Sequence, residues 1–241
     1  MHAEFRSVMA DLERDDTVRI VIVTGTPPAF CVGGDSQALA DHAERGGYDT
    51  GLPAEPARPG SRLRPEFDDD FAWMMAYRTP IVAAVNGAAA GVGLALALFC
   101  DLRFGAASAK LTTAAPKLGL PAEYGMSWVL PRLIGATRAA DLLLSGRVVT
   151  VADTESWGLW NGVEPDGEAT LAAARDYAEL LVRTTGPSAV STTKAQLYQD
   201  LHRHDAAASV ADSKRLLDAA MGTAEYREGV AALREKRPPA F

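Results

Sequence analysis

Two glycine-rich segments, each following a strongly apolar run, constrain the fold of this chain more than any other feature. Val18–Thr24 leads to Phe30–Asp35, and Ile81–Val85 leads to Asn86–Gly93. Short β-branched runs are typical of buried strands, and glycines after a strand favour a tight turn into a helix. Such turns leave backbone N–H groups unpaired, and two of them aimed at one point would stabilise negative charge on a carbonyl oxygen. Each segment alone is explained by backbone geometry, but the pair indicates such an oxyanion hole.

The bulk properties exclude several classes of protein. With 241 residues, 48% of them hydrophobic, the chain can form one sizeable domain and an appendage. A net charge of −7 without a basic tract argues against nucleic acid as a partner. No apolar run is long enough to span a membrane and no signal peptide opens the chain, so we expect a cytoplasmic protein without a membrane partner.

Cysteine and histidine usage predicts neither a disulfide nor a metal site. Cys31 and Cys100 both lie beside apolar segments, which favours reduced thiols. His202 and His204 lie two residues apart in a polar stretch, and no metal-ligand spacing occurs in the chain.

The first part of the chain alternates between two kinds of segment. Strands are predicted at Val18–Thr24, Ile81–Val85 and Leu102–Gly105, and helices at Glu4–Arg14, Phe67–Tyr77 and Gly93–Cys100. This alternation predicts an α/β fold with crossover connections. Residues 36–65 are rich in glycine and proline, and a lid loop and an insertion without function explain them equally well.

The chain becomes helical after Gly167. Alternating polar and apolar residues predict four helices, at Glu168–Val182, Ser188–Leu201, Asp205–Met221 and Thr223–Lys236. Thr223 is a candidate N-cap for the last of them. The residues alone therefore predict a helical appendage with an apolar face.

Further segments resemble a known family. These segments are Arg19–Gly25, Thr79–Gly87, Leu130–Gly135 and Glu235–Phe241. Together with the two glycine turns, they resemble the crotonase superfamily of enoyl-CoA hydratases and isomerases, and the resemblance covers nearly the whole chain. The resemblance implies a crotonase-like spiral of ββα units over 1–185, with a lid loop at about 36–65 over the acyl pocket. It also implies a C-terminal helical region, 186–241, that assembles trimers or hexamers. Family members begin earlier, with a β-hairpin, so we expect the N-terminal hairpin to be missing here.

The same resemblance implies a binding site for an acyl-CoA thioester. The backbone N–H groups of Val32 and Val92 would form the oxyanion hole. Further substrate contacts are expected at Cys31, Gly33, Gly34, Asp35, Ala90, Gly91, Ala115, Leu118 and Tyr124. Asp35 is also a candidate cap for the helix after it. Coenzyme A is part of the substrate, so no separate cofactor and no metal are expected.

The acidic residues distinguish the reactions of this family. Hydratases resemble one another in using two glutamates, and the matching positions here are Ala95 and Ala115. From Phe71 to Ala122 the only acidic residue is Asp101, which matches a structural aspartate of the family. Glu123 matches the acidic position of the isomerase branch. On residues alone, Glu123 is equally typical of an exposed glutamate at a helix N-terminus, where the helix dipole favours it.

Three functions remain open on these grounds. The first is an enoyl-CoA isomerase in which Glu123 alone moves a proton from C2 to C4 while the oxyanion hole holds the dienolate. The second is an enoyl-CoA hydratase of fatty-acid β-oxidation, which Ala95 and Ala115 oppose. The third is a catalytically weakened relative that binds acyl-CoA without turning it over.

Overall fold

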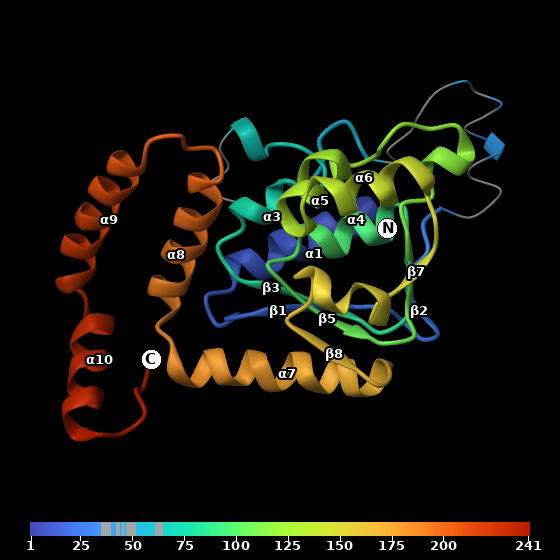
Figure 1. Ribbon diagram of the computed structural model, residues 1–241. Coiled ribbons are helices and arrows are strands. Elements are labelled where there is room, and N and C mark those ends of the chain that lie inside the picture. The colour runs from blue at the N-terminus through green and yellow to red at the C-terminus, as the bar shows by residue number, and fades with distance from the viewer. Residues whose placement is uncertain (35–39, 42–43, 45, 47–51, 61–64) are drawn as a thin grey trace.

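The computed structural model contains two four-stranded sheets with helices around them (Figure 1). It describes residues 1–34, 40–41, 44, 46, 52–60 and 65–241. The predicted lid loop at about 36–65 therefore lies largely outside the described residues. The α/β fold class is confirmed, and the two sheets divide the strands between them.

The first sheet contains the three strands that the apolar runs predicted. Its strands run parallel in the order β1 (Val21–Thr24), β3 (Ile81–Val85), β5 (Leu102–Ala106) and β8 (Gly162–Glu164). All five residues of β3 are buried, because the strand lies between two others and is covered on both faces. The fourth strand, β8, was not expected.

The second sheet brings the two glycine-rich segments together. Its order is β2 (Ala29–Cys31), β4 (Ala88–Ala90), β6 (Lys110–Thr112) and β7 (Val149–Thr150). β2 and β4 pair in parallel, with Ala29 opposite Ala88. The carboxyl ends of parallel neighbours meet at one edge of a sheet, so the turns after β2 and β4 lie side by side.

Helices cover these sheets in the first part of the chain. They are α1 (His2–Arg14), α3 (Trp73–Ala76), α4 (Val92–Phe99), α5 (Met126–Ile134) and α6 (Ala136–Ser145), with 3-10 turns η1 (Pro65–Phe67), η2 (Ala115–Leu118) and η3 (Ala152–Trp157). Seven of the eight residues of α4 are buried, as its unbroken apolar sequence predicts for a helix enclosed by the core.

The predicted helix at Phe67–Tyr77 is wrong in its extent. The structure divides this segment into η1, a turn and the short α3. The interruption falls on a run of aspartates, where the Asp69 carboxylate accepts a hydrogen bond from the backbone N–H of Asp70 at 2.8 Å. Short acidic side chains that bond nearby backbone groups in this way compete with the helix.

The four predicted C-terminal helices are confirmed. They are α7 (Gly167–Thr184), α8 (Pro187–Asp200), α9 (Ala206–Met221) and α10 (Ala224–Glu235). The Thr223 hydroxyl accepts a hydrogen bond from Tyr226 N, as expected of an N-cap. α7 runs along the first sheet, whereas α8, α9 and α10 form a group beside the body of the molecule (Figure 1). The predicted division at 185/186 falls at the junction of α7 and α8 and stays a prediction.

None of the helices in the described residues combines the length and apolar character that a membrane crossing requires. Within the same residues, no three His, Cys, Asp or Glu side chains gather in a way that could hold a metal ion.

A buried ion pair joins α8 to the first sheet. Lys194 Nζ lies 2.7 Å from Asp101 Oδ2 and donates to the carbonyl oxygen of Thr79 at 3.1 Å. The same Asp101 oxygen accepts from the backbone N–H of Ile81, at the start of β3, at 2.6 Å. The expectation that Asp101 is structural is therefore confirmed.

Loss of one partner of this pair is expected to destabilise the fold. Lys194→Met leaves the Asp101 carboxylate buried without its counter-charge, which lowers the free energy of unfolding by about 3 kcal/mol. The matched control is Arg147→Met, which removes an exposed pair with Asp141 and costs less than about 1 kcal/mol. Urea denaturation measures both changes, and equal losses would contradict the assignment.

Candidate active site

The two glycine-rich segments are in contact. A side-chain carbon on Gly93 would overlap the carbonyl oxygen of Cys31, so the start of α4 packs directly against the end of β2. On the other side of the contact, a side-chain carbon on Gly33 would lie 3.6 Å from the carbonyl oxygen of Ala90. Only glycine at position 93 permits so close an approach.

Two glycines at this contact, Gly33 and Gly91, have backbone conformations that turn the chain. Gly91, the N-cap of α4, has φ +51° and ψ −118°, and Gly33 has φ +91°. Both lie in regions that L-residues with a side chain rarely adopt. These two residues precede Val92 and follow Val32, so each predicted oxyanion donor adjoins a turn that only glycine makes easily.

The amides of Val32 and Val92 are free to bind a ligand as far as the described residues go. Val92 opens α4, whose first N–H groups have no acceptor within the helix. Within the described part of the chain, neither amide donates to a backbone oxygen. Val32 is 58% exposed, whereas the side chain of Val92 packs against the core. Two donors in adjoining turns suit the binding of a carbonyl oxygen.

Both positions that match the hydratase glutamates are deeply buried alanines. Ala95 lies in α4 and is 0% exposed, and Ala115 opens η2 and is 1% exposed. The Ala115 carbonyl oxygen accepts a hydrogen bond from Leu120 N at 3.0 Å. A methyl group therefore stands at each of these positions, and neither can accept a proton.

Glu123 places a carboxylate beside Tyr124, shortly before the start of α5. It lies between η2 and α5, half-buried, and its carbonyl oxygen accepts from Met126 N at 2.9 Å. Burial raises the pKa of the Glu123 carboxyl above its usual range, because a charge is less well solvated there than in water. A carboxyl with a raised pKa takes up a proton from carbon more readily than an exposed one.

Met1 and His2, at the start of α1, lie between the loop of Glu123 and the glycine contact. Met1 Sδ lies 4.0 Å from Cys31 Sγ, at the end of β2. The next residue, His2, places its ring 5.8 Å from that of Tyr124, which follows Glu123. Two consecutive residues thus contact both parts of the candidate site.

The remaining predicted substrate contacts differ in their exposure. Leu118 is exposed, Cys31, Ala90 and Tyr124 are half-buried, and Gly34 adjoins the glycine contact. Asp35 lies outside the described residues. The sequence did not indicate that His2 and Phe71 contact Tyr124, because these three residues lie far apart along the chain and follow no common pattern.

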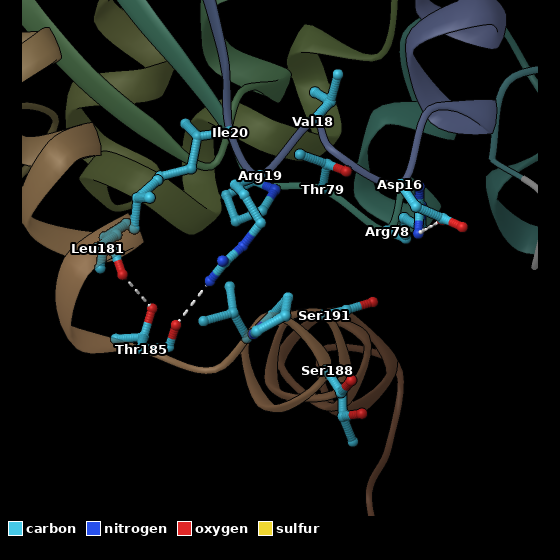
Figure 2. Close-up of a pocket in the computed structure, with 15 residues that line it drawn as sticks. Asp16, Val18, Arg19, Ile20, Arg78, Thr79, Leu181, Thr185, Ser188 and Ser191 are labelled. Carbon is cyan, nitrogen blue, oxygen red and sulfur yellow. Dashed lines mark hydrogen bonds and ion pairs between the residues drawn. The ribbon is translucent and has the colours of Figure 1, made fainter. Parts of the chain in front are cut away.

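A cavity of about 310 Å³ lies elsewhere, between the residues before β1 and the α7–α8 junction (Figure 2). Arg19 reaches across it and donates to the carbonyl oxygen of Thr185 at 2.8 Å. Arg78 pairs with Asp16 at 2.8 Å on its rim. None of the predicted site residues lines this cavity, so it is distinct from the candidate active site.

Comparison with known proteins agrees with the fold. The family model described as enoyl-CoA hydratase/isomerase matches residues 1–241. The 1,2-epoxyphenylacetyl-CoA isomerase of Escherichia coli is 34% identical, over 100% of this chain and 87% of its own. A probable enoyl-CoA hydratase of Mycobacterium tuberculosis is also 34% identical, over 98% of this chain and 81% of its own.

Solved structures of other proteins superpose closely on this chain. The crystal structure of a probable enoyl-CoA hydratase/isomerase from Mycobacterium abscessus superposes with a TM-score of 0.85 at 29% identity, covering 100% of this chain and 87% of its own. That of an enoyl-CoA hydratase from Bacillus anthracis gives a TM-score of 0.82 at 27% identity, covering 99% and 86%. The fold is thus that of these neighbours, and the chain belongs to the enoyl-CoA hydratase/isomerase family.

Proposed function

We propose that this protein is an enoyl-CoA isomerase that moves a double bond in an acyl-CoA thioester, with Glu123 as the only acid–base group. The observation that carries this proposal is the distribution of carboxylates. Both hydratase positions are buried alanines, whereas Glu123 is a half-buried carboxylate whose pKa is raised by burial. One carboxylate is sufficient to shift a double bond, but hydration in this family uses two.

The proposed reaction is a proton transfer within the substrate. The thioester oxygen of a 3-enoyl-CoA accepts hydrogen bonds from the N–H groups of Val32 and Val92. The Glu123 carboxylate removes a proton from C2, and the electron pair moves onto the thioester oxygen as a dienolate. The carboxylic acid then returns the proton to C4, so the double bond moves to C2–C3 and Glu123 is again ionised.

The names of the relatives support an acyl-CoA substrate, and they include both isomerases and hydratases. The Escherichia coli relative is named as an isomerase of an acyl-CoA, which favours the proposed reaction type. The Mycobacterium tuberculosis and Bacillus anthracis proteins are named as hydratases, so hydration is the second candidate. Binding without turnover is the third, and a cytoplasmic location stays a prediction.

We also propose that the protein is a homotrimer or hexamer assembled through its C-terminal helices. α9 buries none of its 16 residues. A cavity of about 730 Å³ lies between α8, α9 and α10. The large exposed apolar side chains of α9 and α10 are Val210, Leu217, Met221, Tyr226, Val230 and Leu233. Exposed apolar surface of this extent is typical of a face that another protein covers, and assembly by the family makes a second copy of this chain the expected partner.

Removal of the proposed base is expected to abolish isomerisation. Glu123→Gln keeps the size of the side chain but cannot accept the C2 proton, so kcat for a 3-enoyl-CoA falls by at least about 100-fold. The absorbance of the new 2-enoyl thioester measures the rate. Glu168→Gln, an exposed glutamate in the first turn of α7, is the matched control and keeps full activity.

Two results would contradict this assignment. An active Glu123→Gln enzyme would exclude Glu123 as the base. Hydration of a 2-enoyl-CoA by the wild type, without isomerisation of the 3-enoyl-CoA, would favour the hydratase.

The pH dependence of the reaction is expected to report the burial of Glu123. The base acts in its ionised form, so kcat/KM decreases as the pH falls through the pKa of Glu123 in the folded protein. Because burial raises this pKa, the acidic limb lies at a higher pH than for an exposed glutamate. A pH–rate profile measures it, and a limb at the usual value for glutamate would contradict the inferred environment.

The assembly is tested by a charge on the apolar face. Leu217→Glu in α9 is expected to reduce the molar mass measured by light scattering, because a buried charge without a partner opposes association. Leu144→Glu in α6 is the matched control, since Leu144 is also exposed (81%) but lies away from this face. A monomeric wild type, or an unchanged mass in Leu217→Glu, would contradict the proposed interface.

A further inference from the structure

Tyr124 has an unusual backbone conformation beside the proposed base. Its φ is +49°, in the left-handed region that disfavours residues with a side chain. In the described residues, the only other non-glycine residues with positive φ are Ala114 and Lys236. Lys236 ends α10, where a left-handed residue is a common C-cap, whereas Tyr124 directly follows Glu123 within the candidate site.

A cluster of three rings holds Tyr124 in place. Its ring lies 5.8 Å from that of His2, at 81°, and 5.8 Å from that of Phe71, at 54°. The rings of His2 and Phe71 lie 4.8 Å apart, edge to face. Separations and angles of this kind are favourable between aromatic rings. The cluster joins α1, the turn before α3 and the loop of Glu123, which are distant in the sequence.

The cluster tolerates a second unfavourable feature. His2 Nε2 is buried and, among the described residues, has no hydrogen-bond partner. A tyrosine that served only to fill space could do so from an ordinary backbone conformation. Strained residues persist only where their surroundings determine them, and they concentrate at functional sites.

The left-handed turn also belongs to the backbone that fixes the residues after Glu123. The carbonyl oxygen of Glu123 is bound to Met126 N, and Gly125, with φ +69°, is the N-cap of α5. The backbone is therefore held immediately after Glu123 by Tyr124 and by the start of a helix. A rotation at Tyr124 would move the Glu123 side chain relative to the helix and to the glycine contact.

We propose that Tyr124 is a positioning residue, whose ring, packed on His2 and Phe71, holds the left-handed turn that directs the Glu123 carboxylate toward the reacting carbons of the acyl chain. This inference rests on the proposed role of Glu123 as the base. It assigns to Tyr124 a role exerted through the backbone, in addition to the predicted contact with substrate.

Three substitutions of Tyr124 test how much its ring and its backbone conformation each contribute to kcat. Tyr124→Phe keeps the ring that packs on His2 and Phe71, and we expect its kcat to stay well above that of Tyr124→Ala. Tyr124→Ala removes the ring, and kcat falls by about tenfold or more with KM little changed, because the base is misplaced. Tyr124→Gly accommodates the left-handed turn without strain but lacks the ring, and its kcat is expected to fall as well.

The matched control is Tyr177→Ala. The Tyr177 ring packs on that of Phe104 at 5.7 Å, a similar contact between α7 and the first sheet, away from the candidate site. This variant loses stability but keeps kcat. Full activity of Tyr124→Gly, or a change confined to KM in Tyr124→Ala, would overturn the proposal, since either would show that the ring does not position the base.

A second readout does not depend on the reaction. The titration of the Glu123 carboxyl is followed by ¹³C NMR in the wild type and in Tyr124→Ala, with Glu123→Gln identifying the signal. We expect its pKa to decrease toward the usual value in Tyr124→Ala, because the misplaced carboxylate is more hydrated. An unchanged pKa would overturn the positioning role. If the wild type does not isomerise a 3-enoyl-CoA, the proposed function fails, and this titration still decides whether Tyr124 positions Glu123.

Discussion

The packing of α4 against the end of β2 is the contact on which the candidate site depends. Gly93 has no side chain, so the helix can approach the Cys31 carbonyl oxygen directly. The parallel pairing of β2 with β4 brings the two segments to the same edge of the sheet. Any larger residue at position 93 would separate the amides of Val32 and Val92, and two separated donors cannot bind one oxygen atom.

The positions at which this chain has or lacks a carboxylate bear on whether it hydrates or isomerises an enoyl-CoA. Ala95 and Ala115 are enclosed by the core, where an ionised glutamate would be costly without a partner. Glu123 lies at the margin of the core, where partial burial alters its proton affinity without preventing ionisation. In the proposed reaction, the fold would supply the site for a thioester oxygen, and the side chains around it would determine what happens to the acyl chain.

The sequence predicted the parts of this structure that carry a strong local pattern. The apolar runs of β1, β3 and β5 and the four C-terminal helices belong to this class. The strands β2 and β4 were missed, because three residues that include alanine carry no strand signal. The resemblance to a family made Glu123 the candidate base, which stays a prediction. The ring cluster of His2, Phe71 and Tyr124 depends on contacts across the fold, which no local pattern reveals.

The buried pair of Lys194 and Asp101 couples the stability of α8 to that of the first sheet. The two residues are 93 positions apart, and Lys194 lies in α8. An ammonium group enters a dry interior at great cost unless its counter-charge is already there. Asp101 is held at the start of β3 by the backbone N–H of Ile81, so the pair favours a docked α8 only while the first sheet is intact. A substitution that loosens β3 would therefore weaken the attachment of the C-terminal helices, although none of them contains the changed residue.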